Sequence, residues 1–243
     1  NLFGPRSCEI HGIKTFNGAK ADDVILKTAS VIINTKSPLA SVFDDVIIGK
    51  QAILPEVDDI VYEDRLGTTG WIYRKKILVG TRDLLIHHGI PVLKEDFEKK
   101  YTRKGRKVLY LAEAGKLMAM FVVSYSADPQ LKKALRKLEK SGMTILVRSA
   151  DPFINDESIA ELFELPDGYI RVMNSSNGRA FEKYSNLFAQ KSPAYIVHNG
   201  SALGLVSAFS AAEDLQETRK LISVLISFGS ALGLGVVGLL AFV

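Results

Sequence analysis

The chain has 243 residues, of which 47% are hydrophobic and 24% charged, with a formal net charge of +4. This composition excludes an intrinsically disordered chain and is sufficient for two domains of ordinary size, each with its own core. A single cysteine, Cys8, excludes an internal disulfide and a cysteine-based zinc site, and it is typical of a reducing, cytosolic setting.

The first recognisable elements are two helices, since residues 1–22 show no clear pattern. The segment DDVILKTASVII begins at Asp22 with two carboxylates, which favour a helix N-terminus. The next segment, SPLASVFDDVIIG, offers Ser37 as N-cap, Pro38 at the first helical position and Gly49 beyond the end. Its apolar residues share one helical face: Leu39, Val42, Phe43, Val46 and Ile47.

Strand-like segments follow these helices. DDIVYED and GWIYRKKILVG predict two antiparallel strand segments, the second bending at Arg74 and Lys75. TRDLLIHHG predicts a short helix ending at Gly89. The densest basic stretch, KKYTRKGRK, suits either phosphate or lipid contact or a solvated linker. We interpret it as a linker and expect no nucleic-acid partner, because only Tyr101 offers a ring for stacking on bases.

The second half alternates strands and helices. KVLYLAEAGKLMAMFVVSY predicts a hairpin turning at Ala114–Gly115, and Asp128 with Pro129 predicts the start of a helix. Three strand segments, GMTILV, YIRVM and AYIVH, then surround a helical segment, INDESIAELFEL. This order predicts an α/β fold: a Rossmann-like domain with a mostly parallel sheet, preceded by an inserted α+β unit.

The last 23 residues, Leu221–Val243, carry no charge, and about 20 such residues span the hydrocarbon core of a bilayer. The polar stretch before them ends in Arg219 and Lys220, as expected at a cytosolic membrane boundary. A buried soluble helix is the alternative, but the glycines that suit close packing in a membrane destabilise a soluble helix. We therefore expect a C-terminal transmembrane helix, with residues 1–220 cytoplasmic, in a fragment of a larger membrane protein.

One strand end has the residue types of a phosphate site. The segment MTILVRSADP places Ser149 and Asp151 directly after an apolar run. Ligands of α/β proteins bind at the carboxyl ends of the strands, where a hydroxyl and a carboxylate are useful. The alternative is a strand that happens to end in polar residues.

Three segments, in this order, resemble the cytosolic half of a P-type (E1–E2) ATPase, most closely the heavy-metal-pumping branch. They are SPLA at 37–40, RLGTTGWIYRKKILVGTRDLLIHHGI at 65–90, and SADPQLKKALRKLEKSGMTILVRSADP at 126–152. The resemblance implies a phosphorylation domain of the haloacid-dehalogenase type with an inserted nucleotide-binding domain. The implied divisions are 1–22 for the first part of the phosphorylation domain, 23–104 for the nucleotide-binding domain, 105–215 for the rest of the phosphorylation domain, and 221–243 for the transmembrane helix.

Such pumps transfer the γ-phosphate of ATP to an aspartate with the help of Mg²⁺. The resemblance therefore implies ATP and Mg²⁺ as cofactors, and a nucleotide, a cation of unknown identity and a membrane as partners. Matched to the family's motifs, Ser149 and Asp151 are the implied catalytic residues, at the family's Thr-Gly-Asp. The implied nucleotide-binding residues are Ser37, Gly67 and Gly70, and the implied metal ligand is Asn199.

The sequence also departs from the family's pattern. It contains no Asp-Lys-Thr-Gly-Thr motif, Ser37 replaces a histidine, and the neutral Asn199 replaces a magnesium-binding aspartate. Arg65 replaces the first glycine of the Gly-rich loop and either pairs with phosphate or is a solvated loop charge. We therefore expect a catalytically degenerate, ATPase-derived membrane protein, a pseudoenzyme. The alternatives are an active cation pump whose phosphorylated aspartate lies upstream of Asn1, and a membrane-tethered regulatory binding protein.

Overall fold

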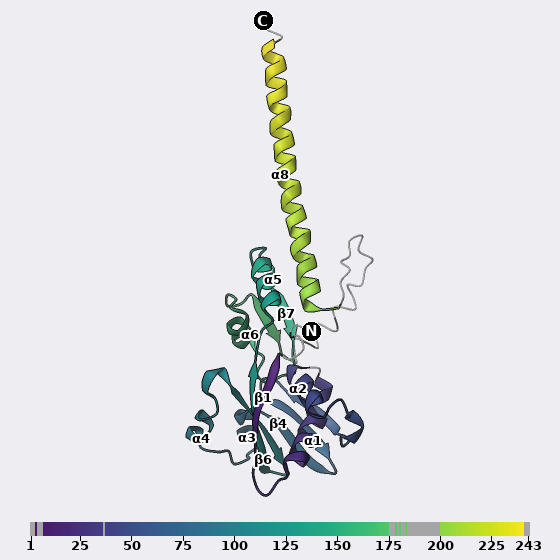
Figure 1. Cartoon of the computed structure of the whole chain (residues 1–243), viewed down its shortest axis with the longest axis vertical. Coiled ribbons are helices and arrows are strands. Elements are labelled where there is room, and N and C mark those ends of the chain that lie inside the picture. Colours follow the sequence, from purple (N-terminus) through teal and green to yellow (C-terminus); the bar gives the residue numbers. More distant parts are fainter. Residues whose placement is uncertain are drawn as a thin grey trace.

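The computed structural model describes residues 3, 7–35, 37–174, 178, 180, 183 and 200–240, without the side chains of 233 and 235–240. Figure 1 shows a large sheet flanked by helices, a smaller unit beside it, and one long helix that extends away from both. The described part of the chain is thus a mixed α/β structure.

The larger sheet has six strands in the order β1-β6-β5-β4-β3-β2, and every neighbouring pair is antiparallel. The strands are β1 (Cys8–Thr15), β2 (Asp58–Glu63), β3 (Gly67–Ile72), β4 (Lys75–Gly80), β5 (Lys107–Glu113) and β6 (Lys116–Tyr125). Strands β1, β5 and β6 therefore share a sheet with strands from within 23–104. The expected boundaries near residues 22 and 104 do not separate two sheets.

Helices cover both faces of this sheet. On one face, α1 (Ala21–Ile32) and α2 (Pro38–Val46) bury their apolar sides, and the ring of Phe43 meets that of Phe121 edge-on at 5.2 Å. On the other face lie α3 (Arg82–His87) and α4 (Glu95–Lys99). Short 3-10 turns complete this unit: η1 (Ile33–Thr35), η2 (Gln51–Ile53) and η3 (Arg103–Gly105).

The smaller unit contains two parallel strands, β7 (Ile145–Arg148) and β8 (Ile170–Met173), with α5 (Pro129–Glu139) and α6 (Asp156–Phe163). The first turns of α8 (Ala202–Leu240) pack against α5 and complete its core. The parallel pairing agrees with the expected α/β pattern. The third expected strand, AYIVH, lies outside the described residues.

Several local predictions are confirmed. Ser37 caps α2 and is followed by Pro38, and Asp128 caps α5 by accepting hydrogen bonds from the backbone N–H groups of Gln130 and Leu131. The hairpin of β5 and β6 turns at Ala114–Gly115.

The structure differs from expectation at two places. GWIYRKKILVG is not one bent strand but the hairpin of β3 and β4, which turns through Tyr73 and Arg74 with positive φ values of 48° and 61°. Neither residue favours that conformation, so the turn carried no sequence signal. Residues 8–15 form an edge strand of the sheet through their pairing with β6.

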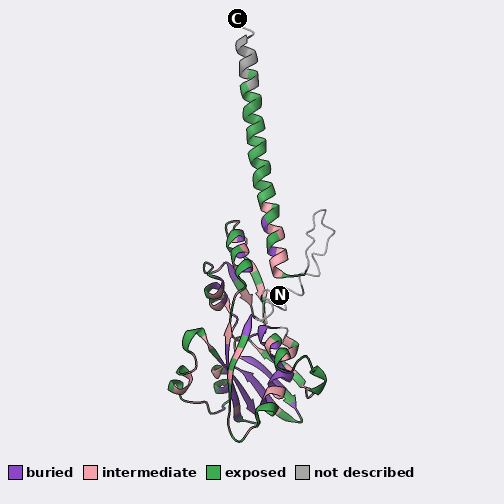
Figure 2. Ribbon diagram, in the orientation of Figure 1, coloured by how far each residue is buried: buried purple, intermediate pink, exposed green. Residues whose placement is uncertain are grey.

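Helix α8 runs without interruption from Ala202 to Leu240, and beyond its first turns its described side chains, which reach as far as Leu234, are exposed (Figure 2). Large apolar side chains are exposed along it from Leu221 to Leu234. Among the residues that the structure describes, no helix is both long and apolar enough to cross a bilayer. The transmembrane helix expected over Leu221–Val243 is thus not confirmed.

Candidate functional site

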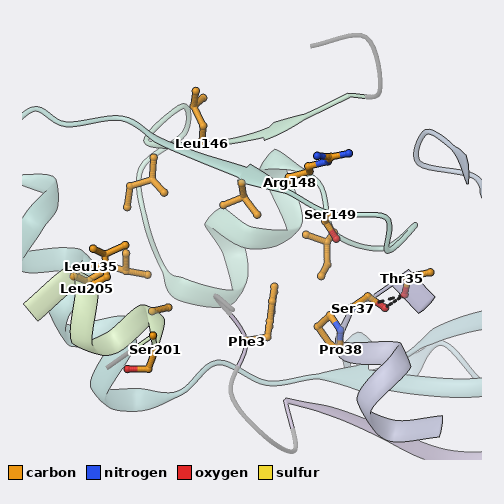
Figure 3. A pocket seen from close by; sticks show the side chains of 16 residues that line it. Phe3, Thr35, Ser37, Pro38, Leu135, Leu146, Arg148, Ser149, Ser201 and Leu205 are labelled. Atoms are coloured by element: carbon orange, nitrogen blue, oxygen red, sulfur yellow. Dashed lines mark hydrogen bonds between the residues drawn. The ribbon is translucent and has the colours of Figure 1, made fainter. Parts of the chain in front are cut away.

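A cavity of about 440 Å³ lies where the two units meet (Figure 3). Thr35, Ser37 and Ser149 place hydroxyl groups at one end of it, and Leu135 and Leu205 line the other end. The remaining described lining residues are Phe3, Pro38, Ile145, Leu146, Val147, Arg148, Ile154, Gly200, Ser201, Ala202 and Val206. Three hydroxyl groups thus gather at one end of the cavity, while the other end is mainly apolar and also contains the hydroxyl of Ser201.

Ser37 forms the wall on the side of α2. Its Oγ atom accepts hydrogen bonds from the backbone N–H of Ala40 at 3.2 Å and from the hydroxyl of Thr35 at 2.8 Å. This local capping fixes the side chain and leaves its own proton to donate. Ser37 is largely buried, and it lines the cavity next to Thr35.

Ser149 forms the opposite wall, directly after β7. Its Oγ atom accepts a hydrogen bond from the backbone N–H of Asp151 at 3.1 Å, and the side chain is half-buried. A serine hydroxyl that accepts one such bond can still donate its proton. Ser37 and Ser149, both predicted from the sequence, therefore lie on facing walls of one cavity.

Asp151 does not line this cavity. Its side chain is buried, and its two carboxylate oxygens accept hydrogen bonds from the Tyr125 hydroxyl at 2.9 and 3.0 Å. The backbone N–H of Phe153 donates to Oδ1 at 3.0 Å. Asp151 thus faces the interior of the protein, and the groups that donate hydrogen bonds to its carboxylate belong to the protein itself.

The electrostatics of Asp151 follow from its burial. Burial raises the pKa of the Asp151 carboxyl from 3.8 to about 6, although the backbone N–H groups of Phe153 and Leu39 and the Tyr125 hydroxyl act in the opposite direction. Burial and the charge of Asp151 raise the pKa of the nearby Cys8 thiol to about 12. Cys8 is therefore an inert, protonated thiol at neutral pH.

A second, much smaller void lies between Asp151 and the larger sheet. Its volume is about 10 Å³, enough for one water molecule at most. Ala150, Asp151 and Pro152 close it from the side of β7, while Ser37 and Thr68 are among the residues on the other side. The loop after β7 is thus packed closely against α2 and β3.

Gly67 and Gly70 lie on β3 and line neither space. A Cβ atom at Gly67 would lie 2.3 Å from the carbonyl oxygen of Val79, and one at Gly70 would lie 2.6 Å from a methyl group of Val57. Gly67 also has a φ of 150°. Close packing inside the sheet therefore explains both glycines.

In the part of the chain that the structure describes, no three His, Cys, Asp or Glu side chains converge. Mg²⁺ in nucleotide sites is usually held by one or two carboxylates together with substrate phosphates and water. Asn199, the implied metal ligand, lies outside the described residues. We therefore derive no chemical step through a metal ion.

Sequence reasoning missed Tyr125, Thr35 and Arg148. Tyr125 is the last residue of a strand, and its partner Asp151 becomes its neighbour only through folding. Arg148 ends β7 directly before Ser149, and its exposed side chain points away from the centre of the cavity in Figure 3. The position of Arg148 directly before the Ser149–Asp151 segment was the one feature of the sequence that could have indicated its place at the cavity.

Comparison with known proteins gives one curated relative at the sequence level. The chain is 23% identical over 176 residues to copper-transporting ATPase 2 of Rhizobium meliloti (strain 1021), an alignment that covers 72% of this chain and 21% of that protein. This chain therefore spans about a fifth of the relative's length. No protein-family model matches the sequence.

Solved structures of heavy-metal ATPases are also similar, at low TM-scores. A zinc-transporting PIB-type ATPase in its E2.Pi state has a TM-score of 0.42 at 12% identity, covering 74% of this chain and 29% of that one. The N-domain of HMA8, a copper-transporting P-type ATPase, has a TM-score of 0.39 at 18% identity, covering 48% of this chain and 98% of that one.

The catalytic domain of the CPx-ATPase CopB-B has a TM-score of 0.40 at 18% identity, covering 74% of this chain and 62% of that one. These TM-scores are too low to define the arrangement of the domains. The sequence alignment and the order of the three motifs identify the chain as a P-type-ATPase-like region.

Proposed function

We propose that the chain is the nucleotide-binding region of a P-type-ATPase-like, cation-transporting membrane protein, and that the nucleotide binds in the 440 Å³ cavity. The observation that carries this proposal is the position of Ser37 and Ser149 on facing walls of that cavity. Its volume lies within the range of about 300–1,000 Å³ that small-molecule sites occupy.

The two ends of the cavity suit the two ends of a nucleotide. Ser37 and Ser149 provide hydroxyl donors for phosphate oxygens, and Phe3 and Leu205 provide apolar surface for a base. A bound ATP would supply a transferable phosphoryl group. The residues of this chain would bind and orient it, and the apolar wall would exclude water.

We also propose that this region does not itself transfer phosphate. The sequence lacks the family's phosphorylated-aspartate motif, and Asp151 is buried and hydrogen-bonded. Two alternatives remain: an active pump whose phosphorylated aspartate lies upstream of Asn1, and a membrane-tethered regulatory binding protein. Incorporation of ³²P from ATP into the complete natural protein distinguishes the active pump both from the proposed non-transferring region and from the regulatory binding protein.

The membrane context is part of the same proposal. Exposed apolar side chains from Leu221 to Leu234 follow Arg219 and Lys220 on α8, an arrangement that suits passage from a polar surface into a bilayer. The resemblance assigns 1–22 and 105–215 to a phosphorylation domain and 23–104 to a nucleotide-binding domain. We propose instead a wider first unit of residues 7–125, because all six strands of the larger sheet lie within it.

Photolabelling tests where the nucleotide binds. The full chain in mild detergent is irradiated with 8-azido-ATP, digested, and the labelled peptides are identified by mass spectrometry. Because the azido group is on the base, we expect label in the peptides that contain Phe3, Leu135 and Leu205, and protection by an excess of unlabelled ATP. Label confined to the β3–β4 hairpin around Gly67 and Gly70, or label that ATP does not displace, would contradict this placement.

A further inference from the structure

The buried carboxylate of Asp151 connects parts of the chain that form different walls of the cavity. Tyr125, its hydrogen-bond partner, ends β6 in the six-stranded sheet, whereas Asp151 belongs to the loop after β7. The pair therefore joins the larger unit to the smaller one. The ring of Tyr125 also meets those of Phe3 and Phe153, at 6.5 and 6.1 Å between centroids, which holds the hydroxyl in place.

Asp151 also reaches the start of α2. Leu39, in the first turn of that helix, lines the 10 Å³ void together with Asp151, and its backbone N–H lowers the pKa of the carboxyl. First-turn N–H groups have no partner within their own helix, and a negative charge at this end is favourable. Leu39 directly follows Pro38 on the cavity wall.

The same residue fixes Ser149 on the opposite wall. The backbone N–H of Asp151 donates to Ser149 Oγ, while the Asp151 side chain is held by Tyr125 and lies against α2. Both walls of the cavity are thus tied to one residue. The void between Asp151 and the larger sheet has a volume of only about 10 Å³, so the loop after β7 packs closely against α2 at this residue.

We propose that Asp151 is a positioning residue, a latch that joins the loop after β7 to β6 and α2 and so sets the spacing of the two cavity walls. In this role Asp151 contacts neither ligand nor reacting atoms. The titratable groups that face it among the described residues are Tyr125 from β6 and Cys8 from β1. Helix α2 contributes a backbone N–H, and β3 contributes the uncharged Thr68 at the edge of the void.

Hydrogen–deuterium exchange tests the latch without any ligand. Asp151→Asn keeps the size of the side chain but replaces one acceptor oxygen with a donor group, and Tyr125→Phe removes only the hydroxyl. In the full chain in mild detergent, we expect exchange in segments 37–41 and 149–154 to speed up by about tenfold in Asp151→Asn, and by less in Tyr125→Phe. Leu109 and Leu111, in the sheet core, should exchange as in the wild type.

Matched controls are Asp58→Asn and Tyr62→Phe, because both residues are exposed on the edge strand β2. Both controls should leave segments 37–41 and 149–154 unchanged. If Asp151→Asn fails to fold, Tyr125→Phe alone decides the question. Unchanged exchange in both segments, in a variant whose core remains protected, would overturn the latch.

Only the effect of the latch on nucleotide affinity rests on the proposed function. Exchange is measured on the free protein, so a chain that binds no ATP can still show the latch. Conversely, ATP binding with unchanged exchange in the variants would leave the proposed function standing and remove the latch.

Discussion

At Asp151 two physical effects oppose each other. Burial favours the neutral acid, whereas the Tyr125 hydroxyl and the Phe153 backbone N–H favour the carboxylate. Burial dominates, and the pKa lies at about 6. The sequence motif suggested a catalytic role for Asp151, but the pKa of its carboxyl is set mainly by burial.

This balance predicts a pH dependence of stability. The folded-state pKa of about 6 lies above the ordinary value of 3.8, so the folded protein binds this proton more tightly than the unfolded chain. The resulting stabilisation is complete below about pH 3.8 and is lost as the pH rises through about 6. At pH 5 it amounts to about 1 kcal/mol. Tyr125 and Cys8 stay protonated throughout, because burial raises both of their pKa values.

Thermal unfolding at pH 7.5 and pH 5.0, followed by circular dichroism, measures this contribution. Between these pH values the wild type should gain about 1 kcal/mol of stability relative to Asp151→Asn, which has no proton to bind. Identical pH responses of the two proteins would show that Asp151 does not titrate in this window.

Gly67 gives a second prediction at the residue scale. Gly67→Ala should lower the free energy of unfolding by roughly 2 kcal/mol or more, because the added methyl group overlaps the carbonyl of Val79 and the φ of 150° is unfavourable for alanine. Gly12→Ala is the matched control, since its Cβ would meet nothing within 4 Å. Chemical denaturation compares the two. Equal stabilities would refute the packing explanation of Gly67.

The helix caps show what local sequence determines. Ser37 and Asp128 were recognised because a cap needs only a side-chain oxygen placed before its own helix. The turn at Ala114–Gly115 was recognised from Gly115, which adopts positive φ without strain. The turn at Tyr73–Arg74 was missed because its conformation is imposed by the pairing of β3 with β4.

Asp128 allows the cap of α5 to be measured. Asp128→Ala removes the acceptor for two backbone N–H groups and should cost about 1 kcal/mol of stability. The control is Asp45→Ala, at an exposed position near the C-terminal end of α2, and it should cost no measurable stability. Urea unfolding followed by circular dichroism provides the comparison, and a loss equal in both variants would exclude a capping role.

At the scale of the whole molecule, the sequence predicted the α/β class and the parallel order of β7 and β8 but not the extent of the larger sheet. β1 joins that sheet by pairing with β6, more than a hundred residues away, and no local pattern encodes such a partner. Of the predicted site residues, Ser37 and Ser149 line the cavity, whereas Gly67 and Gly70 do not reach it, and their binding roles stay predictions. Tyr125 could not be found, because its role depends on this long-range assembly.

The proposed membrane helix gives a prediction at this scale. Replacing both Leu225 and Leu232 by lysine should release the full chain from membranes on alkaline carbonate extraction, because each lysine at the centre of a spanning helix costs about 2.5–3.5 kcal/mol. Leu215→Lys, at an exposed leucine in the preceding polar stretch, should leave the chain in the membrane fraction. Release of the unmodified chain would contradict membrane insertion.

Equilibrium titration of the full chain with ATP, with and without Mg²⁺, measures whether the cavity binds a nucleotide. We expect saturable binding that Ser149→Ala weakens by about tenfold, the loss expected for one hydrogen bond to a charged group. Ser41→Ala, an exposed serine of α2 outside the cavity, should bind as the wild type does. No binding at millimolar ATP, or equal affinities for wild type and Ser149→Ala, would contradict a nucleotide site in this cavity.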